Sequence, residues 1–555
     1  MTNANQQPNT ADALHQEALA LLKSGKLKDG IAVLEKALEL NPGSGDMHND
    51  MATAIWQTNN MELARTHFDK AIKLESTRPH IFNNYGYFLM EAGNPVAAER
   101  MLKKAVDLKP DFIEAISNLG QCLQTLGKFD SAEKVYLAAI RLKPELPETH
   151  FNIGTLYTKM DMTARAEAAF KKTIQLAPGH FRSWFEIARI YYDKNDIDQC
   201  LDCLYKSKAI NQKFRPAWSQ LILVLTERGD QKAADEIAEK ALAIFPNDPP
   251  LILDRAANLR QQGRHQEALD LIEKINKIAI DWPRTHFEKA HNFQALRQTD
   301  RAFIAYCQGN ATRKARAESL APILKLIKDS QSIFTKNWVQ SWTTPQIESL
   351  NIKPIFVVRF PGAAVVTLPA AFFNQPAVEL THGVPAISNV VRYLSDVLAG
   401  NYPAGIASLT DEHITQARRI YVECLRAAGL RLPPGDTVID TSPVNMIHAG
   451  LIHRLFPEAS FLLVQAHPYD EVLSSFMENP LAHDVALRSF DLAEAARLYG
   501  HSFRLWEHYR ATLPLSLLPG AKAENTDLWK TYKPFIEGIF PILEPWAEKY
   551  GYAVK

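Results

Sequence analysis

The sequence predicts an α-solenoid of paired helices followed by an α/β domain with a parallel sheet. One observation is a 34-residue pattern that starts at residue 11 and keeps its register for about 270 residues. Another is a change near residue 352, where short runs rich in Ile, Val and Phe begin to alternate with helical sequence. A chain of 555 residues is too long for one hydrophobic core, so more than one domain is expected.

The repeat pattern places small residues where two helices must touch and breakers where a helix must end. The frames start at residues 11, 45, 79, 113, 147, 181, 215 and 249, and their eighth position carries Ala18, Ala52, Gly86, Gly120, Gly154, Ala188, Ile222 and Ala256. Helix-ending residues recur at the fifteenth and thirty-second positions: Gly25, Gly93, Gly127, Gly229 and Gly263, then Pro42, Pro110, Pro144, Pro178 and Pro246. This combination resembles the tetratricopeptide repeat (TPR), a superhelix of helix pairs that implies binding of other proteins.

The period also sets the expected domain boundaries. We expect a disordered polar tail at residues 1–10 and a TPR array over 11–315, with a weaker ninth repeat starting at residue 283. A helical linker at 316–352 then leads to the α/β domain at 353–555. The first helix of each pair lines the concave side in the family that the repeats resemble.

The sixth position of every frame is an amide or a carboxylate, which predicts a polar stripe on the first helices. Its members are Gln16, Asp50, Asn84, Asn118, Asn152, Glu186, Gln220, Asp254 and Glu288. An asparagine amide both donates and accepts hydrogen bonds, so it can pair with a peptide backbone without reading its sequence. We therefore expect peptide-binding residues at Asp50, Asn84, Asn118, Asn152, Glu186 and Gln220. The alternative is a solvated inner face that only keeps the groove wet.

Three runs predict parallel strands, and a fourth is possible. The runs are KPIFVVRF (353–360), DTVIDTSP (436–443) and SFLLVQAHP (460–468), with LPLSLLPG (513–520) as the possible fourth. We expect helices on both faces of this sheet. Sites on such sheets form beyond the carboxyl ends of the strands, which points to residues 361–367, 441–445 and 466–475.

These segments resemble a P-loop-type sulfotransferase domain, which follows TPR repeats in a group of bacterial proteins. That family's first strand and loop read P-I-F-I-V-G-x-P-R-S-G-T-T, and this chain has PIFVVRFPGAAVV at 354–366. Its T-D-K-x-P-x-N matches IDTSPVN at 439–445, and its R-R-D-P-x-D-x-x-x-S matches QAHPYDEVLS at 465–474. The resemblance implies a sulfotransferase fold over roughly residues 330–555.

The departures from the family pattern remove the groups that hold its donor, 3′-phosphoadenosine-5′-phosphosulfate (PAPS). Residues 362–366 lack the loop's Arg, Ser and Thr, Gln465 and Ala466 replace the arginine pair, and His382 begins the segment where the family has its catalytic Glu. We therefore expect a catalytically degenerate domain that needs no cofactor and serves for docking or capping. The alternative is an active transferase with a rebuilt site, for which the TPR groove recruits the acceptor; its candidate residues are Arg359, His382, His467 and Ser474.

Bulk composition excludes several other classes of function. Basic and acidic residues number 62 each, so the formal net charge of zero gives no reason to expect nucleic-acid binding. The start of the chain lacks a signal-peptide pattern and no apolar run reaches 18 residues, so we expect no membrane span and a cytoplasmic location. The C-x-x-C of Cys200 and Cys203 falls inside a repeat helix and is interpreted as packing, not as a metal or redox site. The sequence leaves the oligomeric state and the partner's identity open.

Overall fold

The computed structural model describes residues 10–160, 162–276, 282–314, 320–347, 350–361, 378–381, 384–430, 432–478, 490–522 and 526–554. The chain divides into two compact units. The first unit comprises Met1–Ile190 and Ala209–Asn211, and the second comprises Tyr191–Lys208 and Gln212–Lys555. The predicted tail at residues 1–10 lies almost entirely outside the described residues.

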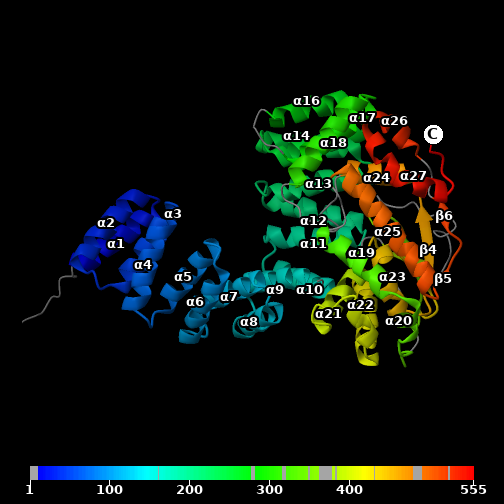
Figure 1. Cartoon of the computed structure of the whole chain (residues 1–555). Helices are drawn as coiled ribbons and strands as arrows, with labels where there is room; N and C mark the ends of the chain where they lie inside the picture. Colours follow the sequence, from blue (N-terminus) through cyan, green and yellow to red (C-terminus); the bar gives the residue numbers. More distant parts are fainter. Residues whose placement is uncertain are drawn as a thin grey trace, which may run out of the picture. The chain divides into compact units, whose positions relative to one another are not determined.

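The first unit consists of successive antiparallel helix pairs, drawn in blue to cyan in Figure 1. The pairs are α1 (Thr10–Lys23) with α2 (Leu27–Leu40), α3 (Gly45–Gln57) with α4 (Met61–Leu74), α5 (Pro79–Glu91) with α6 (Pro95–Leu108), α7 (Ile113–Thr125) with α8 (Phe129–Leu142), and α9 (Pro147–Lys159) with α10 (Thr163–Leu176), followed by α11 (Phe181–Asp193). Side chains cap several helix starts, as Ser44 does for α3 and Asn60 for α4. The predicted prolines all lie two residues beyond the end of a second helix.

The fifteenth position adopts a left-handed backbone, which explains its glycines. Gly25, for example, has a φ of 80°, and the same region is occupied by Asn59 in the next repeat at 65°. A left-handed residue ends the first helix and turns the chain into the second, and glycine does this without steric cost. The turn between paired helices is therefore confirmed at the predicted place.

The eighth position is small because the second helix of the pair packs directly on it. A Cβ atom built on Gly120 would lie 2.4 Å from the Tyr136 ring, and one on Gly154 would lie 2.6 Å from the Phe170 ring. Tyr136 and Phe170 are themselves buried, so they cannot move aside cheaply. The predicted contact between paired helices is confirmed.

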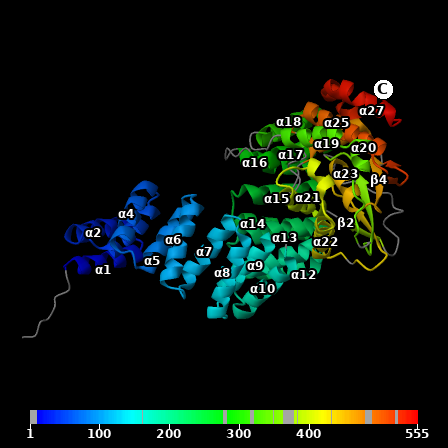
Figure 2. The ribbon, with the colours of Figure 1, turned by 60° about the horizontal axis from the view of Figure 1, so that its bottom comes forward.

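The helix pairs continue into the second unit, including the ninth repeat that the sequence predicts. The helices are α12 (Ile197–Ile210), α13 (Arg215–Arg228), α14 (Gln231–Ile244), α15 (Pro249–Gln261), α16 (His265–Asn276), α17 (Pro283–Ala295) and α18 (Thr299–Lys314). Figure 2 shows α13 to α18 from a second direction. The segment after the repeats contains α19 (Ala321–Ile333) and α20 (Lys336–Gln340), and its described residues between α20 and residue 353 are not helical.

A parallel sheet follows, as predicted, in the order β2-β3-β1-β4-β5, with β6 also paired to β4. The strands are β1 (Lys353–Val358), β2 (Val378–Thr381), β3 (Thr437–Asp440), β4 (Ser460–Gln465), β5 (Ser516–Leu517) and β6 (Ala521–Lys522). The three clear strand predictions correspond to β1, β3 and β4, and the possible fourth corresponds to the two-residue β5. β2 is an additional strand, which pairs with β3 in parallel register.

Among the described residues, the helices of this domain gather on one face of the sheet. Phe356, Val438 and Phe461 point to a large core shared with α21 (Ala386–Val397), α22 (Asp411–Ala427), α23 (Asn445–Leu455), α24 (Pro468–Met477) and α25 (Leu492–Thr512). Val357 and Leu462 point the other way, into a small cluster formed by strand residues and Leu518. The expectation of helices on both faces is thus confirmed for one face. On the opposite face, the small apolar cluster contains no helical residue among those that the structure describes.

The α/β domain packs directly on the last helix pair of the repeats. The Phe303 ring of α18 stacks on Phe535 of α26 (Leu528–Ile536), with 4.7 Å between ring centroids. Asn310 Nδ2 donates a 2.8 Å hydrogen bond to the carbonyl oxygen of Phe476 in α24. One hydrophobic core includes Tyr306 of α18 together with Tyr532 of α26 and Leu543 of α27 (Phe540–Lys549). The apolar end of the helix array is therefore covered by this domain.

Candidate functional site

The first helices of the first unit are linked by polar bonds between neighbouring repeats. Each bond joins the fifth position of one repeat to the sixth position of the next, 35 residues later: His15 Nε2 with Asp50 Oδ2 at 2.7 Å, Asn84 Nδ2 with Asn49 Oδ1 at 3.2 Å, and Asn118 Nδ2 with Asn83 Oδ1 at 2.9 Å. We call these bonds inter-repeat rungs. They place three of the predicted peptide-binding residues in one continuous row.

The rungs fix the orientation of the sixth-position amides. Asn49 and Asn83 are each only 1% exposed, so their oxygens are anchored inside the packing of the helices. Asn84 and Asn118 are half-buried and each uses an Nδ2 hydrogen in its rung. An amide group has two N–H donors and one oxygen, so each asparagine keeps a second N–H for another partner. Fifth-position residues were absent from the sequence prediction, although the polar His15, Asn49 and Asn83 were a usable signal.

The rungs stop after three repeats because the fifth position changes. Ser117 and Phe151 occupy it next, and within the described part of the chain no hydrogen bond holds the side-chain amide of the half-buried Asn152. Glu186 pairs within its own helix, with 3.1 Å between its Oε2 and Nη1 of Arg189. Burial raises the pKa of Glu186, and the Arg189 charge opposes this.

In the second unit the sixth positions have other surroundings. Gln220 on α13 is half-buried, but Asp254 and Glu288 are each only 9% exposed. Asp254 Oδ1 lies 2.7 Å from Nη2 of Arg284, and Glu288 Oε2 lies 3.1 Å from Nε of Arg260. The predicted stripe is therefore not a surface at these two repeats, because each carboxylate is nearly buried and has one oxygen in an ion pair with a partly exposed arginine.

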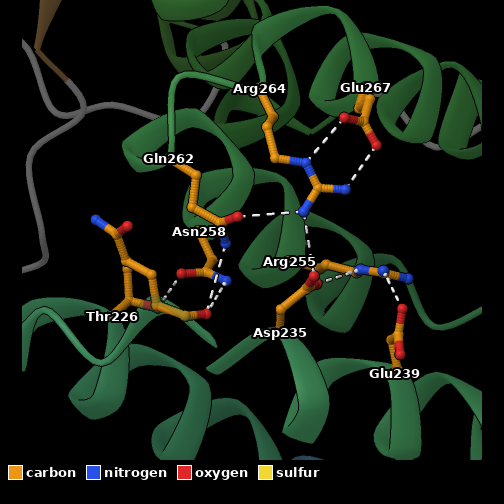
Figure 3. Close-up of polar contacts among 9 residues, drawn as sticks. Thr226, Asp235, Glu239, Arg255, Asn258, Gln262, Arg264 and Glu267 are labelled. Atoms are coloured by element: carbon orange, nitrogen blue, oxygen red, sulfur yellow. Dashed lines mark hydrogen bonds and ion pairs between the residues drawn. The ribbon is translucent and has the colours of Figure 1, made fainter. Parts of the chain in front are cut away.

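A second polar network on α13 to α16 is also internally satisfied (Figure 3). Arg255 Nε donates to Asp235 Oδ1 at 2.9 Å, and Arg264 Nη1 donates to Asp235 Oδ2 at 3.3 Å. Arg264 also binds both carboxylate oxygens of Glu267, at 2.8 and 2.7 Å. The bonds to Asp235 join α14 to its neighbours, whereas the bidentate Arg264–Glu267 pair is local to the start of α16. Together these bonds leave few of the charged groups for a ligand.

His15 and Asp50 form the most polarised of the rungs. The hydrogen bond to Asp50 raises the pKa of His15, against the opposing effect of burial. Asp50 also accepts a 3.1 Å bond from Nδ2 of Asn49. This carboxylate is thus held by two neighbours and remains half-buried at the start of the row.

In the α/β domain, a buried arginine and a buried glutamate lie beyond the carboxyl ends of β1 and β4. Arg359 follows β1 and is 9% exposed, and Glu471 in the first turn of α24 is 6% exposed. Burial raises the pKa of Glu471 to about 8, although the backbone N–H of Ala466, the Arg359 charge and the Tyr499 hydroxyl each lower it. The sequence prediction includes Glu471 only within the segment 466–475 and does not name it as a candidate, because an acidic residue in a first helical turn usually has only a capping role.

The other transferase candidates are held by the chain or lie outside the described residues. His467 Nε2 donates to the carbonyl oxygen of Ala553 at 2.7 Å, and its Nδ1 accepts from the Tyr469 N–H at 3.3 Å. Both ring nitrogens are therefore engaged, and His467 caps α24. Ser474 is half-buried on α24, while His382 and loop residues 362–367 fall outside the described part.

Cys200 and Cys203 are packing residues, as the sequence predicts. Their exposed fractions are 0% and 4%, and neither forms a disulfide. Burial raises the pKa of Cys200 to about 12, which makes the reactive thiolate rare. Within the described residues, no cluster of three or more His, Cys, Asp and Glu is placed to hold a metal ion. None of the described helices combines the length and apolar character needed to cross a membrane.

Protein-family models identify the helix pairs. Two models described as tetratricopeptide repeat match residues 89–149 and residues 11–44, 147–180 and 181–214. A third, described as YpiA-like C-terminal tetratricopeptide repeats, matches residues 46–111. An uncharacterized protein of Aquifex aeolicus is 20% identical over 320 residues, which cover 53% of this chain and 39% of that protein. The chain thus spans about two fifths of the length of that relative.

Several solved structures are similar to parts of this chain. Pseudomonas aeruginosa PilF is 25% identical, with 37% of this chain and 92% of that chain covered and a TM-score of 0.33. A tetratricopeptide repeat protein from Parabacteroides merdae is 19% identical, with coverages of 43% and 93% and a TM-score of 0.36. YrrB, titled a TPR protein with an unusual peptide-binding site, is 22% identical, with coverages of 33% and 95% and a TM-score of 0.28. The chain carries tetratricopeptide repeats between residues 11 and 214.

Proposed function

We propose that the first unit is a protein-binding scaffold that holds an extended peptide segment along its first helices. The observation that carries this proposal is the row of half-buried asparagines whose amides are fixed by inter-repeat rungs or are unengaged. Asn84 and Asn118 each keep one N–H beyond the rung, and Asn152 keeps its whole amide within the described structure. An extended backbone offers alternating donors and acceptors, which such amides can bind without reading side chains.

Pre-organisation favours this role over a merely wet surface. A side chain that must be ordered on binding costs about 0.5–1.5 kcal/mol. The rungs to the buried oxygens of Asn49 and Asn83 pay this ordering cost during folding. Each further hydrogen bond to a partner then contributes about 0.5–1.5 kcal/mol net. A solvated face would not need its amides oriented by two buried asparagines.

Asn152 gives a clean test, because replacing it breaks no hydrogen bond among the described residues. The tagged full chain and its Asn152→Ala variant are incubated with lysate, cross-linked, and compared by quantitative mass spectrometry. We expect the variant to lose cross-links that map to α5, α7 and α9 while its melting temperature stays unchanged. The matched control is Gln175→Ala, an exposed amide on the second helix α10. Equal cross-linking by both variants would refute the role of the asparagine row.

For the α/β domain, we infer a sulfotransferase-like domain that has lost donor binding and caps the last repeat. The Phe303–Phe535 stack and the Asn310 hydrogen bond support the capping part. The altered motifs at residues 362–366 and 465–466 support the loss of donor binding. We also propose that the protein needs no cofactor, binds no nucleic acid and is located in the cytoplasm.

One observation favours the alternative of an active transferase with a rebuilt site. Arg359 and Glu471 lie together beyond the carboxyl ends of β1 and β4, where ligands bind on sheets of this type. Isothermal titration with PAPS separates the two readings. A capping domain that has lost donor binding should release or absorb no heat on titration with PAPS. Saturable micromolar binding would refute this proposal and favour the active transferase.

A further inference from the structure

Charge is segregated between the two helices of each repeat in the first unit. The first helices α1, α3, α5, α7 and α9 carry seven acidic and two basic residues, which gives a net charge of −5: Asp12, Glu17, Asp46, Asp50, Glu91, Glu114 and Glu148 against Lys23 and Lys159. The second helices α2, α4, α6, α8 and α10 carry ten acidic and thirteen basic residues, a net charge of +3. The first helices are therefore acidic although the whole chain is neutral, and we call the side that they form the first-helix face.

An aromatic pair of one half-buried and one exposed ring lies on the same face. Trp56 of α3 and Tyr87 of α5 meet edge to face, with 5.7 Å between ring centroids. Tyr87 is 38% exposed, so a ligand can reach its ring. It stands three residues after Asn84 and four before the exposed Glu91, so all three share one side of α5.

We propose that the first-helix face binds an extended segment rich in lysine or arginine, with one cation over the Tyr87 ring. The inference rests on the proposed peptide-binding function and adds the chemical class of the partner. The faces of aromatic rings attract Lys and Arg by about 0.5–2 kcal/mol, and the Glu91 carboxylate stands one helical turn from Tyr87. The asparagine row supplies contacts to the backbone, and the acidic residues select the side chains.

The same charge argument sets what the face rejects. An acidic peptide meets a net charge of −5 and is repelled, and so is the phosphate backbone of a nucleic acid. Exposed charges are screened over about 8 Å at physiological ionic strength. Binding of the cationic segment therefore weakens as salt is added.

The test uses the full chain and three fluorescein-labelled octapeptides, with fluorescence anisotropy as the readout. One peptide alternates Lys and Ser, one alternates Glu and Ser, and one alternates Gly and Ser. The variant combines Tyr87→Ala with Glu91→Gln, both exposed positions. The matched control combines Tyr205→Ala, a tyrosine with the same 38% exposure on α12, with Asp107→Asn on α6, both on second helices.

We expect the Lys–Ser peptide to bind and the other two to give no saturable signal at the same concentration. The Tyr87/Glu91 variant should weaken that binding about tenfold, with an unchanged melting temperature, and the control should not. Weaker peptide binding by the control but not by the Tyr87/Glu91 variant would overturn the placement of the cation over the Tyr87 ring. Equal binding of all three peptides, reduced by Asn152→Ala, would overturn the charge selection while leaving the proposed function standing. Binding of none of them by wild type would overturn the charge selection too, whereas the cross-linking result would still decide the proposed function.

Discussion

Replacing Glu471 by glutamine isolates the energetic cost of a buried carboxylate at the edge of the sheet. Glu471 is 6% exposed, and burial raises its pKa from 4.5 to about 8. Glutamine keeps the size of the side chain and an oxygen that can accept the bond from the Ala466 N–H, which lies 3.3 Å from Oε1. The substitution therefore removes the ionisation and leaves most of the packing unchanged.

The sign of the effect follows from proton binding in the two states. Between about pH 4.5 and pH 8 the unfolded chain has lost the Glu471 proton and the folded chain still holds it, so rising pH favours unfolding. Each pKa unit corresponds to about 1.4 kcal/mol, so the full shift is worth about 5 kcal/mol. We expect Glu471→Gln to match wild type near pH 4.5 and to gain up to this amount by pH 8.

Equilibrium urea denaturation at several pH values measures the difference directly. Trp506 and Trp529 are each 1% exposed in the same domain, so their fluorescence reports its unfolding. Glu537→Gln serves as the control, because the Glu537 side chain is exposed and its replacement should change the free energy of unfolding little. A constant difference between Glu471→Gln and wild type across this pH range would refute the reasoning.

Three further outcomes test the repeats. Asn118→Ala leaves the buried Asn83 oxygen without its hydrogen bond and should lower the free energy of unfolding by about 1–3 kcal/mol. Asn152→Ala should change this free energy by less than about 0.5 kcal/mol. Equal losses for the two variants in urea denaturation would contradict the rung. Gly120→Ala brings a methyl group within 2.4 Å of the Tyr136 ring and should cost about 1–3 kcal/mol, so an unchanged melting temperature would show that the pair can separate freely. Asp50→Asn should lower the His15 pKa in an NMR titration. The His15–Asp50 pair stabilises the fold below the unfolded histidine pKa of about 6.5 and loses this as pH rises through the folded value; an unchanged His15 pKa would argue against their bond.

The repeats could be predicted because several positions repeat with one period for mechanical reasons. Gly120 is small because Tyr136 packs on it, and Gly25 recurs because its backbone is left-handed. The strands were predictable only where enough apolar residues follow one another. β1 and β4 each have six residues, and the four-residue β3 has two adjacent apolar residues, Val438 and Ile439. In β2 (Val378–Thr381) a glutamate separates the apolar residues, and β5 has only two residues. Pairing with a neighbouring strand, not local sequence, defines such short strands.

The candidate site was only partly predictable, because its bonds join different positions of neighbouring repeats. A scan of the sixth position finds Asn84, and a separate scan of the fifth position finds Asn49. Their rung spans 35 residues, one more than the period, so comparing equivalent positions cannot reveal it. Three-dimensional stacking sets this offset, since one helix passes its neighbour at a slant.

Polarity at one position also cannot tell a surface from a buried ion pair. Asn118 and Asp254 occupy the same position of their repeats, yet Asn118 is half-buried and Asp254 is 9% exposed beside Arg284. The difference depends on which residue the neighbouring repeat presents: the Asn83 amide in one case and the Arg284 guanidinium in the other. An amide partner leaves N–H donors for a ligand, while a guanidinium forms an ion pair with the carboxylate. The binding capacity of the row is therefore a property of pairs of repeats, which is why we place it on the asparagines of the first unit.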